Sequence, residues 1–505
     1  MRRSLTLGMA AIALAAASTA LAQAPQRGGT LQVATDQSPV GLDPHVATAF
    51  STALINQNIY EGLTEIDQNL RVQPALASRW TSSDGGLKYT FTLRPNVVFH
   101  NGEAMTSSDV AYSFRRVMDA KTASPFASRL NLVKTLSTPN PTTFVIELSK
   151  PFAPLLSEIA DIRIVPEQYV AGGGDLQRRA IGTGPFMLRE WIPDTALVLE
   201  RNPRYWRSGL PYLDVVRVNI VPDAATRQVG LASGTYHFLP NVDPSVAVTL
   251  KNTPNVQLIR SNDLAYTLVG MNTTRKPFDN PLVRQALNYA LDRNQIVQAA
   301  YFGEGVPAGP LSPALKSWST PTSAFACYRA DPERARALLR QAGYPNGVDF
   351  ELMTFGTIKT VLDVATVAQA QLQKAGFRPK LVVKEFGQFV QDWRNSNFDA
   401  FVSSNGGSSD PDGYLYRTFV TGGSTNVFKY TNPTVDQLLE KARTTVDAAQ
   451  RRTMYAQLQN TLACSGPIAH VAYGTLFSVA RENFRGYIQP PTRSLIFLRQ
   501  AWLAR

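Results

Sequence analysis

The residue types that most often carry out catalysis are sparse in this chain and poorly placed for it. Its four histidines are far apart, and none stands near a glutamate at the spacing of a metal site; they are His45, His100, His237 and His470. The chain contains no Gly-x-Ser-x-Gly elbow, phosphate-binding loop or Cys-x-x-Cys pair. We therefore predict no catalytic residue, no metal site and no cofactor, and an enzyme stays only as an alternative.

The stretch best suited to binding chemistry is Ser403–Tyr414, SSNGGSSDPDGY. It follows a predicted strand over 398–402, and open α/β sheets place ligands at the carboxyl ends of their strands. Its small side chains would let backbone N–H groups approach a ligand closely. An ordinary turn closed by Asp410-Pro411 is the alternative interpretation. We predict ligand contacts from Asn405, Gly406, Gly407, Ser408 and Asp410.

The clearest pattern of secondary structure in the chain lies over Leu87–Phe114, LKYTFTLRPNVVFHNGEAMTSSDVAYSF. Apolar and polar residues alternate over 87–94, which predicts a half-buried strand. After a break at Pro95-Asn96, Thr106 and Asp109 form the Thr-x-x-Asp arrangement of a capping box. The stretch therefore predicts a β-hairpin followed by an amphipathic helix.

The same stretch closely resembles the signature of the family 5 solute-binding proteins, the dipeptide- and oligopeptide-binding components of ABC importers. The family pattern is an aromatic-rich strand, Leu-Arg, a Val-x-Phe-His run, a Gly, then Thr-x-x-Asp-Val and a Phe, and all are present. Other stretches that resemble family elements follow in order: Gly28-Gly29-Thr30-Leu31, Leu42-Asp43-Pro44, Tyr60-Glu61-Gly62-Leu63, Gly182-Thr183-Gly184-Pro185, Arg201-Asn202-Pro203-x-Tyr205-Trp206, Val283-Arg284-Gln285-Ala286-Leu287 and Asp331-Pro332. The resemblance runs from about Gly28 to at least Asp412.

This resemblance implies an α/β fold of two lobes joined by a hinge, the type II, cluster C periplasmic binding protein architecture. Lobe 1 would carry an extra domain, and the chain would cross between lobes near 262–272 and again near 481–489. The implied boundaries are 23–60, 181–265 and 485–505 for lobe 1, 61–180 for the extra domain and 266–484 for lobe 2.

The resemblance also implies a function, which is to capture a small peptide-like or other polar solute and deliver it to an inner-membrane ABC permease. Further candidate contacts are Ser38 and Tyr60 on one lobe and Tyr266 at the first crossover. Core packing is the alternative for both tyrosines. Such a protein is expected to act as a monomer.

The anchors that peptide-binding relatives use are missing here. Those relatives pair the peptide's α-ammonium with an Asp three residues before the Asp/Glu-Pro pair, and that position is Gly407 in this chain. Dipeptide binders hold the carboxylate with an Arg, whereas the region 354–359 offers only Lys359, which lacks the bidentate fork. A buried charge without a counter-charge costs several kcal/mol. We therefore predict a modified peptide, a glutathione-like compound, an opine, a sugar-like compound or a metal chelate rather than a free dipeptide.

The N-terminus predicts export. Arg2 and Arg3 precede an apolar run over 5–17, and Ala20-Leu21-Ala22 is a cleavage site, so we expect a signal peptide cut after Ala22. The run is too short for a membrane anchor, and no Cys follows it as in a lipoprotein. The paired arginines leave twin-arginine export as an alternative route to the periplasm.

Composition adds limits on partners and on the cysteines. The chain is 44% hydrophobic and 17% charged, as in globular proteins, and its net charge of +12 is dispersed without a Lys/Arg cluster, so we predict no nucleic-acid binding. Cys327 and Cys464 enter an oxidising compartment. They are either a disulfide or two buried free thiols.

Overall fold

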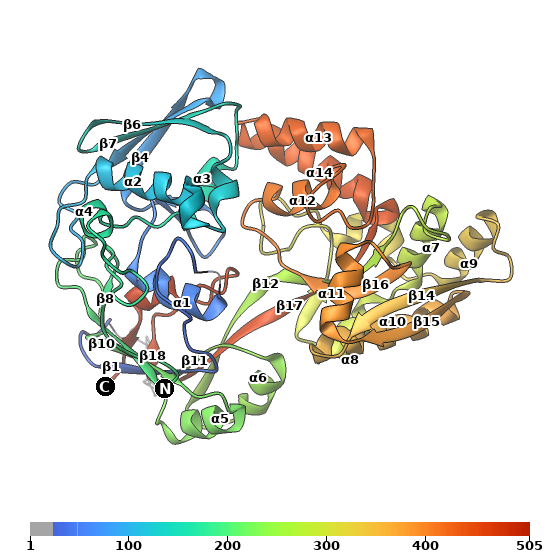
Figure 1. Cartoon of the computed structure of the whole chain (residues 1–505). Coiled ribbons are helices and arrows are strands. Elements are labelled where there is room, and N and C mark those ends of the chain that lie inside the picture. The colour runs from blue at the N-terminus through green and yellow to red at the C-terminus, as the bar shows by residue number, and fades with distance from the viewer. Residues whose placement is uncertain (1–23, 48) are drawn as a thin grey trace, which may run out of the picture.

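The computed structural model describes residues 24–47 and 49–505, so the predicted signal peptide and its cleavage site lie outside the described residues. Two lobes stand next to each other, and one 11-stranded sheet continues through both (Figure 1). The strand order is β15-β14-β16-β12-β17-β11-β1-β10-β9-β8, and β13 (Gly305–Pro307) also pairs with β17. No helix among the described residues is long and apolar enough to cross a membrane.

Two long antiparallel strands, β12 (Val256–Met271) and β17 (Ile468–Arg481), connect the lobes. Their register is interrupted between Asn262 and Tyr266. On one side of this irregularity β17 pairs with β11, and on the other side β12 pairs with β16. Both strands therefore take part in the sheets of both lobes. The two crossover segments and the domain boundaries given above stay predictions.

The first lobe is built on the β11 side of the sheet and is covered by short helices. Its strands are β1 (Thr30–Thr35), β8 (Phe186–Ile192), β9 (Ala196–Arg201), β10 (Val215–Ile220) and β11 (Phe238–Val242), and its helices are α1 (Phe50–Ile59), α5 (Ala224–Ser233) and α6 (Pro244–Leu250). β1 is parallel to both β10 and β11. The C-terminal strands β18 (Phe484–Arg485) and β19 (Trp502–Leu503) pair with each other, and Phe484 joins this lobe's core.

A separate antiparallel sheet tops the first lobe (Figure 1). Its order is β4 (Ala77–Ser83), β5 (Lys88–Leu93), β7 (Thr143–Leu148) and β6 (Val133–Asn140), with helices α2 (Ser107–Met118), α3 (Leu155–Glu158) and α4 (Glu167–Ala171) beside it. A small hairpin, β2 (Thr64–Ile66) and β3 (Val72–Pro74), precedes it. Buried residues of the sheet and of α2 form a core of their own.

The signature stretch folds as predicted at its helix and differently at its hairpin. The capping box is present, with Thr106 and Asp109 bonding to each other's backbone at the start of α2. The hairpin partner of β5 is β4, however, and the run 97–99 makes a single bridge to Ala104. Pro95 has no N–H for a ladder, and Asn96 in a left-handed conformation (φ 59°) turns the chain out of the sheet.

The second lobe has parallel strands flanked by helices. The strands are β14 (Val348–Phe355), β15 (Phe377–Lys384) and β16 (Ala400–Asn405), and the helices are α7 (Pro281–Ala290), α8 (Arg293–Tyr301), α9 (Pro332–Gln341), α10 (Lys359–Lys374), α11 (Phe386–Arg394), α12 (Asp412–Phe419), α13 (Pro433–Thr444) and α14 (Ala448–Ser465). The pair Asn280-Pro281 predicts the start of a helix, because the missing N–H of a proline costs nothing at the first helical position, and Pro281 is the first residue of α7. Cys327 and Cys464 are joined by a disulfide, with their Cα atoms 5.7 Å apart.

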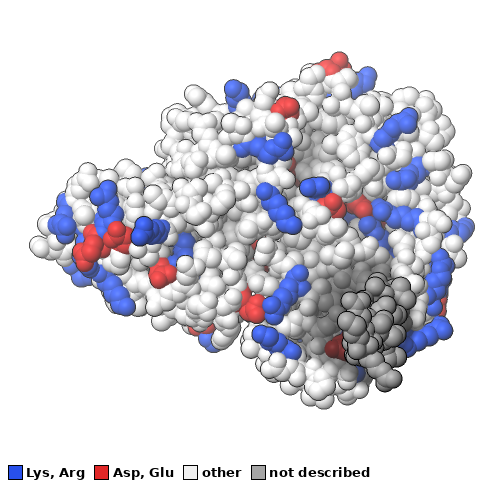
Figure 2. All heavy atoms as spheres, turned by 180° about the vertical axis from the view of Figure 1, so that it is seen from behind, with Lys and Arg blue, Asp and Glu red and all other residues white. Residues whose placement is uncertain are grey.

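The surface charge is dispersed. Seen from behind, Lys and Arg side chains are scattered over both halves of the molecule, with Asp and Glu among them (Figure 2).

Candidate ligand-binding site

The carboxyl ends of strands from both lobes point toward the crossing between the lobes. In the second lobe, β16 ends at Asn405, opposite Tyr266 of β12, where the irregular part of β12 begins. β14 and β15 are parallel to β16 and end at the same edge. In the first lobe, β11 ends at Val242, opposite Phe477 of β17, and β1 runs parallel to it. Because α/β sheets bind ligands at such edges, these two edges are the candidate site.

On the second lobe, the structure brings most of the predicted residues together. The Asn405 side-chain amide donates to the Tyr266 hydroxyl at 3.4 Å. Tyr266, Gly407, Ser408 and Asp410 line one small cavity of about 10 Å³, about enough for a single water molecule. Burial raises the pKa of the Tyr266 hydroxyl, so this side chain stays a neutral hydrogen-bonding group. Tyr266 is thus both buried and beside the loop.

The loop backbone itself explains why position 407 carries no side chain. A Cβ atom on Gly407 would lie 2.4 Å from the carbonyl oxygen of Leu264. This is closer than real Cβ contacts, so a residue with a side chain would force the loop away from β12. The neighbouring Gly406 is exposed, and a Cβ there would have no heavy atom of the described chain within 4 Å.

The two carboxylates of the Asp-Pro-Asp turn already have cationic partners. Both oxygens of Asp410 accept hydrogen bonds from Arg451, at 2.8 and 3.1 Å. Asp412 is held in the same way by Arg443, whose closest contact is 2.8 Å. These ion pairs fix the start of α12 to α13 and α14. The geometry therefore gives Asp410 a structural role instead of the free ligand contact that the sequence suggested.

The two candidates on the first lobe do not join this group. Tyr60 is completely buried in the core of the first lobe, where it packs with Leu31 and Phe186, so core packing is its observed role. Ser38 is half-buried in the loop after β1, at the expected edge. Its hydroxyl accepts a hydrogen bond from the backbone N–H of Asp194 at 3.1 Å.

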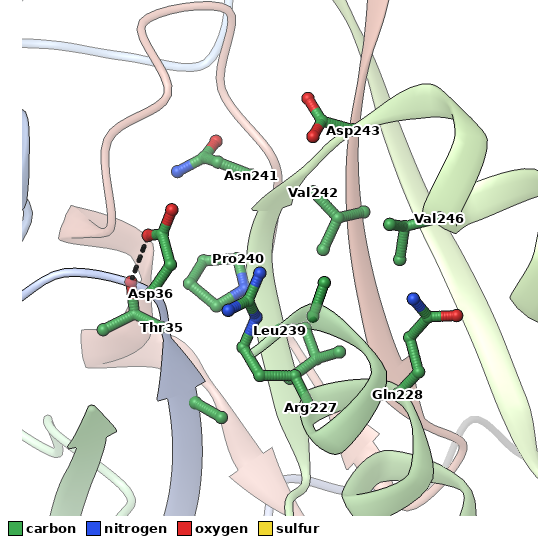
Figure 3. Close-up of a pocket in the computed structure, with 12 residues that line it drawn as sticks. Thr35, Asp36, Arg227, Gln228, Leu239, Pro240, Asn241, Val242, Asp243 and Val246 are labelled. Carbon is green, nitrogen blue, oxygen red and sulfur yellow. Dashed lines mark hydrogen bonds between the residues drawn. The ribbon is translucent and has the colours of Figure 1, made fainter. Parts of the chain in front are cut away.

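A pocket at the first-lobe edge contains residues that sequence reasoning missed. It has a volume of about 150 Å³ and lies between the ends of β1 and β11 and the helices α5 and α6 (Figure 3). Asp36, Asn241, Asp243 and Arg227 bring polar groups to it. The Arg227 guanidinium donates to the backbone carbonyl oxygens that precede α5, at 2.5 and 2.8 Å. Applying the rule of strand carboxyl ends to β1 would have predicted Asp36, which follows it directly.

The sequence motifs that carry the family resemblance converge on one buried carboxylate away from this edge. Glu61 accepts hydrogen bonds from the Thr183 hydroxyl at 3.0 Å and from the Tyr205 hydroxyl and the Trp206 indole N–H, both at 2.8 Å. Burial raises the pKa of Glu61. Gly184 lies so close to the backbone of residue 59 that a Cβ would clash with it. The motifs that contain Glu61, Thr183 and Tyr205-Trp206 are far apart in the sequence, and hydrogen bonds to this carboxylate join them in the fold.

Comparison with known proteins identifies the family. The sequence matches the bacterial extracellular solute-binding proteins, family 5 Middle, over residues 71–426, which is more than half of the chain. The chain belongs to this family. The two-lobed α/β fold expected from the resemblance is confirmed, because solved structures of family members share it over most of both chains. The family 5 protein is accordingly a solute-binding component of an ABC importer.

The similar proteins bind different solutes. Heme-binding protein A of Haemophilus influenzae is 30% identical over 539 residues, which covers 97% of each chain. Glutathione-binding protein GsiB of Salmonella paratyphi A is 29% identical and covers 89% of this chain and 90% of its own. HbpA2 from Haemophilus parasuis superimposes with a TM-score of 0.87 at 27% identity, over 94% of this chain and all of its own. AppA from Bacillus subtilis, solved with a nonapeptide, gives 0.76 at 27% identity, over 95% and 100%.

Proposed function

We propose that this family 5 protein captures a small solute other than an unmodified dipeptide and hands it to its ABC permease. The proposal rests on the surroundings of Gly407 in the loop that follows β16. Gly407 has no room for the anchoring carboxylate of the peptide binders, because Leu264 lies against it. Asp410 and Asp412, the neighbouring carboxylates, are occupied by arginines. An α-ammonium placed there would be buried without a free counter-charge.

A glutathione-like peptide is the first candidate. Glutathione has a γ-linked glutamate and two carboxylates, so its charges do not lie where those of a linear dipeptide do. The relative GsiB of Salmonella paratyphi A, which matches this chain over 90% of its own length, is named as a glutathione-binding protein. This similarity supports a glutathione-like solute.

A heme-like solute is the second candidate, and a specific surface favours it. Ile358, Val383 and Phe386 are 45%, 54% and 44% exposed at the carboxyl ends of β14 and β15. The Phe386 ring packs on Phe355, with centroids 5.1 Å apart. Exposed apolar side chains gathered at a ligand-binding edge fit a flat apolar solute better than a small polar one.

Export to the periplasm through the signal peptide cleaved after Ala22, action as a monomer, lack of enzymatic activity and the lobe boundaries given above are also part of this proposal. They are supported by the sequence pattern and by the family, whose members are extracellular solute-binding proteins.

The test is native mass spectrometry of the protein purified from its own periplasm, followed by calorimetric titration with reduced glutathione, hemin and the dipeptide Ala-Ala. We expect a stoichiometric bound solute that is not a dipeptide, and binding of glutathione or hemin but not of Ala-Ala. A retained mixture of dipeptides, or tight Ala-Ala binding, would refute the proposal.

A further inference from the structure

One arginine of the second-lobe edge differs from the neighbouring arginines in its hydrogen-bond and ion-pair partners. Arg417 is a half-buried residue of α12, and its Nη2 donates to the carbonyl oxygen of Gly406 at 3.2 Å. This contact places the guanidinium beside the loop that carries Asn405 and Gly407. Its Nε is buried and has no hydrogen-bond partner within the described residues.

The two arginines that bind the aspartates of the same turn each have a carboxylate partner, unlike Arg417. Arg443 and Arg451 each make two or more hydrogen bonds to one aspartate. Arg417, in contrast, forms no ion pair with any carboxylate in the part of the chain that the structure describes. A partly desolvated guanidinium without a counter-charge is costly, and the cost is removed when an anion binds.

The position of this charge reverses the polarity of the loop relative to a dipeptide binder. Peptide binders place a carboxylate at the position of Gly407 for the peptide's ammonium. Here the loop carries no free carboxylate, and a cation stands next to it. Two more groups that can donate to an anion belong to this loop and to the strand beside it, namely the Asn405 amide and the Tyr266 hydroxyl to which it donates at 3.4 Å.

We propose that Arg417 is the anion anchor of the solute site and that the solute presents a carboxylate to it. The Arg417 guanidinium would take the carboxylate, with the Asn405 amide as a second donor. This inference rests on the proposed function and narrows its solute to carboxylic acids. Both candidate classes satisfy it, since glutathione carries two carboxylates and heme carries two propionates.

The experiment compares acids with their esters on wild type and variants. The probes are reduced glutathione, glutathione diethyl ester, hemin and hemin dimethyl ester, titrated into Arg417→Gln, Arg417→Lys and the control Arg340→Gln. Arg340 is an exposed residue of α9 that makes no ion pair within the described chain. Melting temperatures establish that each variant is folded.

We expect wild type to bind one of the two acids more tightly than its ester. Arg417→Gln should weaken binding of that acid by about 30-fold or more and leave the ester unchanged, because the lost interaction is a desolvated charge pair. Arg417→Lys should bind with intermediate affinity, since lysine keeps the positive charge but lacks the paired N–H donors with which a guanidinium binds both oxygens of a carboxylate. Arg340→Gln should match wild type.

The inference is overturned if Arg417→Gln binds the acid as tightly as wild type, or if the ester binds wild type as tightly as the acid. It is also overturned, with the proposed function intact, if the solute retained by periplasmic wild type has no acid group. If wild type retains no solute and binds none of the four probes, the proposed function fails and this inference fails with it.

Discussion

Among single residues, the two adjacent glycines of the ligand loop have opposite surroundings. A Cβ atom at Gly407 would lie 2.4 Å from a carbonyl oxygen, whereas Gly406 faces open space in the described chain. Overpacking of this kind costs about 1–3 kcal/mol. We expect Gly407→Ala to lower the unfolding free energy by about that amount and Gly406→Ala to leave it unchanged, as measured by urea unfolding. Equal stability of the two variants would contradict the close approach of the loop to β12.

His100 gives a second prediction, on pH. Its side chain is partly buried, with Nδ1 accepting the backbone N–H of Gly182 at 3.3 Å and Nε2 donating to the carbonyl oxygen of Gly184 at 3.1 Å. This arrangement needs the neutral ring, and burial lowers the pKa of His100 to about 4. The unfolded chain, with a pKa of about 6.5, then binds more protons than the folded chain between these values. The stability from His100 is complete above about pH 6.5 and is lost as the pH falls to about 4.

The measurement is unfolding by guanidinium chloride at neutral pH and at about pH 5 for wild type and His100→Gln. The stability advantage of wild type over the variant should shrink by about 2 kcal/mol over this range, because about 1.4 kcal/mol per pH unit is the limit for one proton. His45 and His470 are also buried with lowered pKa values, so wild type itself should lose more than this. An advantage that is constant with pH would show that His100 is not buried in its neutral form.

Among the elements, the disulfide ties a short turn at 326–328 to the long helix α14. Cys327 and Cys464 are 137 residues apart in the sequence. In the chain-entropy account, closing a loop of this length stabilises a fold by about 4–5 kcal/mol. We expect the double variant Cys327→Ser/Cys464→Ser to lose stability of that order in urea unfolding. Its solute affinity should stay unchanged, because the bond packs with Phe325 and Ala463 in a cluster separate from the ligand loop.

Wild type treated with a reductant is the matched control and should unfold like the double variant. A double variant as stable as oxidised wild type would mean that the disulfide constrains a segment already compact in the unfolded chain.

The helices and strands also show which parts of the structure can be predicted from the sequence. The starts of α2 and α7 were predicted because their signals, a capping box and an Asn-Pro pair, act within four residues. Contacts between distant segments were not predictable in this way. The pairing of Asp410 with Arg451 depends on how α14 packs, and the pocket residues Asp36 and Asn241 meet only because β1 and β11 are parallel neighbours. The overall fold came instead from the family resemblance.

In the whole molecule, the lobes touch beyond the two strands that connect them. The backbone N–H of Ala153, in the upper part of the first lobe, donates to the carbonyl oxygen of Arg443 on α13 at 2.9 Å. The Arg443 guanidinium lies 5.4 Å from the Phe152 ring. Leu70, in the turn between β2 and β3, is 7% exposed and belongs to the core cluster of the second lobe. These contacts hold the lobes together.

Leu70 offers a way to change lobe closure without substituting a residue of the hinge or of the ligand loop. Its backbone is in the left-handed region (φ 61°), which disfavours a leucine, so the turn is shaped to present this side chain to the other lobe. Separating the lobes would expose the side chain, at a cost of about 2 kcal/mol. Leu70→Ala removes most of that cost, and the equilibrium between closed and open forms should shift toward the open form by about 30-fold or less.

Small-angle X-ray scattering should therefore give a larger radius of gyration for Leu70→Ala than for wild type without added solute. The apparent affinity for the bound acid should fall in proportion to the lost closed population, because solute captured between the lobes binds the closed form. Val229→Ala, at a 68% exposed position on α5, is the matched control and should leave both quantities unchanged. If Leu70→Ala weakens binding while the radius of gyration stays that of wild type, Leu70 acts on the site directly and not through closure.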